Sequence, residues 1–147
     1  MVQTQDESHT LAMGTDGDSS NNNQDFVEEM HIGGIVNKAV TMNEKAVPAI
    51  EILKMATVNG AEALGFEKLG LIKEDYLADL TIFDLESNSF TPRNNLISAL
   101  VYSANSHDVE SVICDGKFIM RDRELVNVDE EKVRQVVNKR WEDIKSR

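Results

Sequence analysis

Residues 11–30 read LAMGTDGDSSNNNQDFVEEM. The stretch begins with a short apolar run, which together with His9 and Thr10 predicts a buried strand over residues 9–13 that stops at Gly14. Residues 14–24 contain no apolar side chain and consist mainly of Gly, Asp, Ser and Asn, which favour turns. Asp25 is typical of a helix N-cap, and apolar residues at helical spacing follow it. We therefore expect a strand, a polar loop and a helix in this order.

Two further helical regions are expected along the chain. Pro48 fits the first turn of a helix, and Gly65 stands where a left-handed residue would end the helical stretch. Asp129 predicts the N-cap of a last helix, with Val128 and Val133 placed as a hydrophobic staple. The apolar side chains of this last helix form one stripe, which we expect to be buried: Val133, Val136, Val137, Trp141 and Ile144.

Between these helices the sequence favours strands. Leu80, Ile82 and Phe83 mark one strand, and residues 109–114 mark a second, in which we expect Cys114 to point inward as a small buried hydrophobe. Asp-Gly at residues 115–116 separates the second strand from another apolar run and is a strong hairpin signal. A further short strand is expected over residues 124–126. These strands predict a small antiparallel β unit.

Composition excludes several classes of function. The 147 residues carry a net charge of −11, which repels phosphate backbones and anionic lipid, so we expect neither a nucleic-acid nor a membrane partner. A single cysteine cannot form an internal disulfide, and no apolar run approaches the roughly 20 residues of a membrane span. These features predict a cytoplasmic protein. A complete (β/α)₈ barrel needs about 250 residues, more than this chain has.

The acidic loop does not match a calcium site. Asp16, Asp18 and Ser20 occupy positions 1, 3 and 5 of an EF-hand loop. Positions 6 and 12 should be glycine and glutamate, but Asn21 and Val27 stand there. On composition alone, a solvated connection rich in turns accounts for this loop.

No other motif in the chain forms an active site by itself. The three histidines, His9, His31 and His107, form neither a His-x-His pair nor a pair four residues apart on a helix, so they do not predict a zinc site. Cys114 has no adjacent base, and no glycine-rich phosphate loop is present. Asp16 remains, because it follows a predicted strand and precedes a helix, where α/β enzymes have their catalytic groups.

Residues 11–30 resemble the end of the eighth barrel strand, with its loop and helix, in the amidohydrolase superfamily. The branch that they resemble contains methylthioadenosine/S-adenosylhomocysteine deaminases and triazine chlorohydrolases. Later motifs are similar to this family in the same order, although residues 72–79 depart from its usual Gly-Lys-x-Ala-Asp turn. The matching motifs are LKMATVNGAEALG at 53–65, ADLTIFD at 78–84, LVYSA at 100–104 and VESVICDGK at 109–117.

The resemblance implies an α/β fold, namely a C-terminal fragment of a (β/α)₈ metal-dependent hydrolase barrel with the C-terminal strands of its small β-sandwich domain. Residues 1–65 would hold the last barrel strand, the metal-ligand loop and the following helices. Residues 66–128 would form the sandwich part with its hairpin, and residues 129–147 a C-terminal amphipathic helix.

The resemblance also implies a chemistry. Asp16 would ligate a single divalent metal, zinc or iron, and would carry a proton from the metal-activated water to the leaving group. The substrate would be a small molecule with a purine- or triazine-like ring, which loses ammonia, an amine or chloride.

The family's other metal ligands, a His-x-His pair and further histidines, and its catalytic glutamate have no counterpart in this sequence. We therefore expect the isolated chain to be inactive and to hold no metal. Exposed truncated surfaces would favour a homo-oligomer. The alternative is a non-enzymatic α+β module for interaction or dimerisation.

Overall fold

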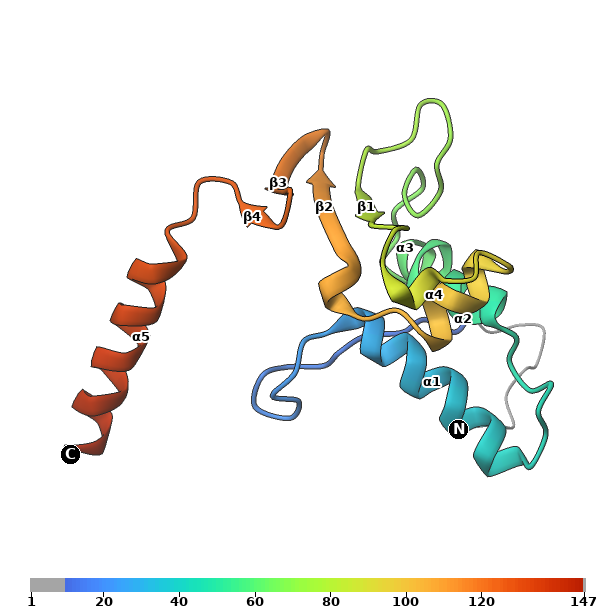
Figure 1. Ribbon diagram of the computed structural model, residues 1–147, viewed down its shortest axis with the longest axis horizontal. Coiled ribbons are helices and arrows are strands. Elements are labelled where there is room, and N and C mark those ends of the chain that lie inside the picture. The colour runs from blue at the N-terminus through green and yellow to red at the C-terminus, as the bar shows by residue number, and fades with distance from the viewer. Residues whose placement is uncertain (1–9, 147) are drawn as a thin grey trace.

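The structure, a computed structural model, describes residues 10–146. Its helices precede, interrupt and follow one small sheet (Figure 1). The helices are α1 (Phe26–Thr41), α2 (Ala49–Ala56), α3 (Val58–Ala63), α4 (Leu96–Tyr102) and α5 (Glu130–Lys145), with short 3₁₀ turns η1 (Asn88–Phe90) and η2 (Ser106–Asp108). The strands are β1 (Leu80–Phe83), β2 (Val109–Cys114), β3 (Lys117–Arg121) and β4 (Glu124–Leu125). The chain is thus a mixed helix and sheet protein.

The hydrophobic core lies among α1, α2, α4 and η1, which gather on one side of the sheet in Figure 1. Ile52 of α2 and Val101 of α4 are fully buried, and Phe90 of η1 is 2% exposed. Val27 and Met30 of α1 also belong to this cluster, in agreement with their helical spacing. Burying a side chain of this size contributes roughly 1.5–3 kcal/mol to the stability of the fold.

Two adjacent glycines let α1 approach its neighbours closely. A Cβ atom on Gly33 would lie 2.7 Å from Cε of Met13, and one on Gly34 would lie 2.8 Å from Cε1 of Tyr102. Lys38, one turn further along α1, donates a hydrogen bond to the Tyr102 hydroxyl. The segment before α1 and the end of α4 therefore both pack against the same turn of α1.

The four strands form an antiparallel sheet in the order β1-β2-β3-β4. β2 and β3 are joined by the predicted hairpin, in which Asp115 and Gly116 have φ values of 49° and 73°. Positive φ at both central positions is the requirement of the tight turn that Asp-Gly favours. The small antiparallel β unit expected between residues 80 and 126 is confirmed, together with its hairpin.

The predicted strand over residues 9–13 is wrong for its described part, residues 10–13, and His9 lies outside the described residues. The backbone N–H of Met13 bonds to the carbonyl of Met55 at 3.2 Å, and the Asn59 amide bonds to the Leu11 carbonyl at 2.9 Å. A strand requires a ladder of bonds to a neighbouring strand. No strand lies beside residues 10–13 in the described part of the chain, so they do not form a β-strand.

Two burial predictions are also wrong. Cys114 is exposed because it is the last residue of β2, beside the hairpin turn. Asp129 caps α5 as expected, accepting a bond from the Lys132 N–H at 2.9 Å, but α5 has no buried residue. Figure 1 shows α5 apart from the helical core, and no described element covers its apolar stripe. The exposed side chains of this stripe are Val133, Val136, Val137, Trp141 and Ile144.

The chain has a large surface for its mass. Its accessible surface is 11215 Å², whereas a compact folded protein of 16.4 kDa exposes about 7,500 Å². Exposed apolar side chains on α5 and on β3 and β4 contribute to this excess. Among residues 10–146, no helix combines the length and the apolar character required to span a bilayer.

Candidate functional site

Asp16 lies in the polar loop between residues 10–13 and α1. Its backbone has φ = 63°, in the left-handed region that side-chain-bearing residues adopt rarely and that Asp tolerates better than most. The side chain is exposed, and its Oδ1 accepts a hydrogen bond from the Gly17 N–H at 2.8 Å. The loop thus presents the carboxylate of Asp16 to solvent in a defined backbone conformation.

The loop after Asp16 is closed by backbone bonds to a single carbonyl. The Gly17 carbonyl accepts from the N–H of Ser20 at 3.0 Å and from the N–H of Asn21 at 2.8 Å. The side-chain amide of Asn21 then donates to the Thr15 carbonyl at 3.0 Å and to Glu29 Oε1 at 2.8 Å. Asn21 therefore joins the two ends of the loop to each other and to the first turns of α1.

Three side chains at alternate positions lead from the loop into α1. The side-chain oxygens of Asn21, Asn23 and Asp25 each accept a hydrogen bond from the backbone N–H two residues later. Such bonds define Asx turns. Sequence reasoning identified Asp25 as a cap but missed Asn21, although Asx residues spaced two apart were the signal that could have revealed this chain of turns.

Asp25 has a lowered pKa because of its hydrogen bonds. Partial burial raises the pKa of Asp25, but hydrogen bonds from the Ser106 hydroxyl and from the backbone N–H groups of Glu28 and Val27 outweigh that effect. The pKa therefore lies below its ordinary value. The negative charge of the Asp25 carboxylate also complements the positive end of the α1 dipole.

The described residues do not form a complete metal site. No group of three or more His, Cys, Asp or Glu side chains in residues 10–146 is placed to hold a metal ion. His31 lies half-exposed on α1, and His107 is exposed on η2, where its backbone carbonyl accepts a bond from Arg123 Nε at 3.3 Å. Asp16, the residue predicted for a site, has an exposed carboxylate in a structured loop.

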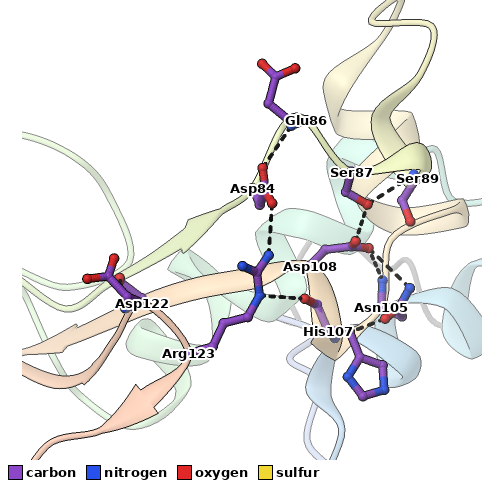
Figure 2. Close-up of polar contacts among 10 residues, drawn as sticks. Asp84, Glu86, Ser87, Ser89, Asn105, His107, Asp108, Asp122 and Arg123 are labelled. Atoms are coloured by element: carbon purple, nitrogen blue, oxygen red, sulfur yellow. Dashed lines mark hydrogen bonds and ion pairs between the residues drawn. The ribbon is translucent and has the colours of Figure 1, made fainter.

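A second cluster of charged and polar residues ties the sheet to the segment that precedes β2 (Figure 2). Asp108 is 5% exposed, and its carboxylate accepts bonds from the Ser87 hydroxyl and from the backbone N–H of Asn105 at 2.9 Å. Burial raises the pKa of Asp108, but these hydrogen bonds more than offset the effect and lower it. Groups of the chain itself occupy the carboxylate through these hydrogen bonds, so Asp108 stabilises the fold.

Asp84 has a similar structural role at the end of β1. Arg123 donates to Asp84 Oδ2 at 2.9 Å, and the Glu86 N–H donates to Oδ1 at 2.9 Å (Figure 2). The bond from Arg123 is the main reason that the pKa of Asp84 is lowered, followed by the bond from Glu86. This pair connects β1 to the β3–β4 turn and offers no reactive group.

A shallow groove lies beside the core and has an entirely apolar lining. It contains no polar group that could orient a substrate, which ligand sites usually require. The residues that line it are Phe83, Leu85, Phe90, Leu96, Ile97 and Leu100. The groove is therefore unsuited to chemistry, and Asp16 with its loop is the best candidate for a functional site in the described residues.

Comparison with known proteins gives a consistent result. The sequence profile of the amidohydrolase family matches residues 4–119. The chain is 48% identical over 135 residues to a 5-methylthioadenosine/S-adenosylhomocysteine deaminase of Thermoanaerobacter pseudethanolicus, a match that covers 91% of this chain and 31% of the deaminase.

Two solved structures are also similar. An adenosine deaminase from Xanthomonas campestris with bound zinc superposes with a TM-score of 0.90 at 35% identity, over 95% of this chain and 32% of that one. An atrazine chlorohydrolase from Arthrobacter aurescens, complexed with zinc, superposes with a TM-score of 0.79 at 26% identity, over 88% of this chain and 28% of that one. The chain spans about a third of the length of the curated relatives that it matches.

Proposed function

The chain belongs to the amidohydrolase family, and from this membership we propose that it contributes Asp16 to the metal centre of a hydrolase acting on purine- or triazine-like rings. The observation that carries the proposal is the fixed, left-handed Asp16 at the head of the loop that leads into α1. Relatives named as deaminases and a neighbour named as a chlorohydrolase support the class of substrate.

The chemistry of Asp16 fits one position in such a centre. A carboxylate oxygen is an accepted ligand for zinc and iron. Oδ1 accepts the Gly17 N–H, whereas Oδ2 has no hydrogen-bond partner in the described part of the chain. Catalytic zinc takes three protein ligands, and residues 10–146 hold no group of three. We assign the other ligands to polypeptide outside the described residues.

Asp16 would transfer a proton as well as bind the metal. A bound zinc or iron ion supplies a water that ionises near neutral pH. The Asp16 carboxylate would accept a proton from a water that attacks an sp² ring carbon, and would then give that proton to a nitrogen leaving group. The group released would be ammonia or an amine, which takes the proton, or chloride, which leaves as an anion while the proton passes to solvent.

The unpaired parts of the chain support one assignment of its segments within such a hydrolase. We assign residues 1–65 to the last barrel strand, the ligand loop and the following helices, residues 66–128 to the sandwich part and residues 129–147 to a C-terminal helix. Residues 10–13 alternate between exposed and half-buried, as a strand does, but have no neighbouring strand among the described residues. Further barrel strands would supply that neighbour.

The proposal is tested with two proteins. One is the 147-residue chain by itself, which we expect to bind no stoichiometric zinc and to turn over neither S-adenosylhomocysteine, methylthioadenosine nor aminotriazines. The other is a hybrid protein in which this chain replaces the 135-residue stretch that it matches in the Thermoanaerobacter pseudethanolicus deaminase. We expect the hybrid protein to bind zinc and to release ammonia from at least one of these substrates. Robust turnover by the chain alone would contradict the assignment of the remaining ligands.

A second candidate function is a non-enzymatic module that associates with a copy of itself or another protein. The exposed stripe of α5 and the large accessible surface favour it. Analytical sedimentation and binding of a dye specific for apolar surface test this candidate. A monomer that binds little dye would remove its support.

A further inference from the structure

The side-chain amide of Asn21 lies at the junction between the proposed metal ligand and the helix behind it. Its Nδ2 donates to the Thr15 carbonyl at 3.0 Å and to Glu29 Oε1 at 2.8 Å. The Thr15 carbonyl belongs to the planar peptide group that also contains the Asp16 nitrogen. Holding that carbonyl fixes the plane from which the φ rotation of Asp16 is measured.

Asp16 needs such a restraint because φ = 63° is an unfavourable backbone conformation for a residue with a side chain. Without a restraint, a residue in an exposed loop returns to the broad region of negative φ. The bond from Asn21 to the Thr15 carbonyl opposes that return. The bond from the Gly17 N–H to Asp16 Oδ1 fixes the side chain, but it does not fix the preceding peptide.

Glu29 supplies the rigid end of the contact. Its backbone N–H donates to the Asp25 carbonyl at 3.1 Å in the first turn of α1, and the neighbouring Met30 is buried in the core. The half-buried Glu29 side chain therefore extends from a helix that is packed in place. Asn21 transmits this fixed position to the peptide before Asp16.

We propose that Asn21 and Glu29 are positioning residues, which hold the peptide before Asp16 so that its carboxylate is preorganised for a divalent metal ion. This inference rests on the proposed role of Asp16 as a ligand. Partners that orient a ligand in this way typically contribute 10- to 100-fold to metal affinity or activity. We expect loss of the Asn21 amide to weaken zinc binding by about 10-fold, the low end of that range, because Asn21 acts through the backbone.

The test compares zinc dissociation constants in the hybrid protein, measured by competition with a chelator. Asn21→Ala should weaken zinc binding about 10-fold. Asn22→Ala is the matched control, because Asn22 is exposed and makes no side-chain hydrogen bond in the described residues. The unfolding temperature of each metal-free variant is measured in parallel. We expect Asn21→Ala to bind zinc more weakly than Asn22→Ala, although the two variants unfold at similar temperatures.

Variants of Glu29 keep the inference testable if Asn21→Ala does not fold. Glu29→Gln keeps an oxygen that accepts the Asn21 amide and should retain zinc affinity, whereas Glu29→Ala should lose part of it. Equal dissociation constants for Asn21→Ala and Asn22→Ala, or for Glu29→Ala and Glu29→Gln, would overturn the inference. Asp16→Asn tests the proposed function separately from the positioning role of Asn21 and Glu29. A hybrid protein that keeps its zinc affinity without the Asp16 carboxylate contradicts the proposed function itself.

Discussion

Gly70 lies against the backbone of Val58 so closely that a Cβ atom on Gly70 would be 2.7 Å from the Val58 Cα. Gly70 also has φ = 85°, in the left-handed region. The segment that leads from the helices to the sheet therefore passes the start of α3 at a point where only glycine fits.

Replacing Gly70 with alanine should destabilise the chain strongly. The left-handed backbone and the collision with Val58 act together, and we expect a loss of about 3 kcal/mol in the free energy of unfolding. Gly65→Ala is the control, because Gly65 has φ = 78° but no atom within 4 Å of the added Cβ. It should cost only about 1 kcal/mol. Urea unfolding of the two variants measures the difference, and equal losses would show that the contact with Val58 is unimportant.

Removal of the Asp108 carboxylate should also destabilise the fold. Asp108→Ala leaves the Ser87 hydroxyl and the N–H of Asn105 without their acceptor in a largely buried place. We expect a cost of about 3 kcal/mol in the free energy of unfolding. Asp143→Ala, on the exposed α5, should change it by about 0.5 kcal/mol or less. A small effect of Asp108→Ala would mean that water replaces the lost acceptor.

The stability of the chain should fall in acid. Asp25, Asp84 and Asp108 all have a pKa below the ordinary value of 3.8. A carboxylate whose pKa is lower in the folded than in the unfolded state stabilises fully above the unfolded value, and this contribution disappears as the pH falls through the folded value. Urea unfolding between about pH 6 and about pH 2 should show a decline that begins near pH 4. Asp108→Asn should make that decline shallower; an unchanged slope would argue against a lowered pKa at Asp108.

Asp16→Asn should abolish most of the activity proposed for the hybrid protein. The variant keeps the size of the side chain but removes the negative charge and the proton acceptor that the proposed function assigns to Asp16. General base groups contribute roughly 10²- to 10⁴-fold, and we expect a loss in kcat/KM of that order. Ammonia release and zinc content measure it, with Asp18→Asn as the control in the same loop. Full activity of Asp16→Asn would exclude Asp16 from the site.

Local signals in the sequence predicted the boundaries of elements well. Asp25 and Asp129 cap their helices through bonds to backbone N–H groups within three residues, so near neighbours alone determine these boundaries. The Asp115-Gly116 turn likewise depends on the φ values of two adjacent residues. Gly65 adopts the expected left-handed conformation after α3.

Burial and pairing were harder to predict, because they depend on what lies next to an element. The stripe of α5 has the spacing of a buried face, yet no described element covers it. Residues 10–13 have strand-like composition but no strand beside them among the described residues. The bridge from Asn21 to Glu29 joins residues eight positions apart through side chains, a contact that no periodic pattern indicates. The role of Asp16 itself stays a prediction.

The close packing at Gly33 and Gly34 depends on the number of residues between the N-cap Asp25 and this glycine pair. Successive residues on a helix are rotated by about 100°, so a deletion or insertion of one residue between Asp25 and Gly33 would turn the glycine pair away from both neighbours. Side chains with a Cβ would then meet Met13 and Tyr102, which now approach to less than 3 Å of the glycine Cβ positions. Substitutions on the exposed face of α1 are compatible with this packing, whereas a change in the number of residues is not. Homologous chains should therefore vary in sequence along this helix while keeping a constant spacing from cap to glycine pair.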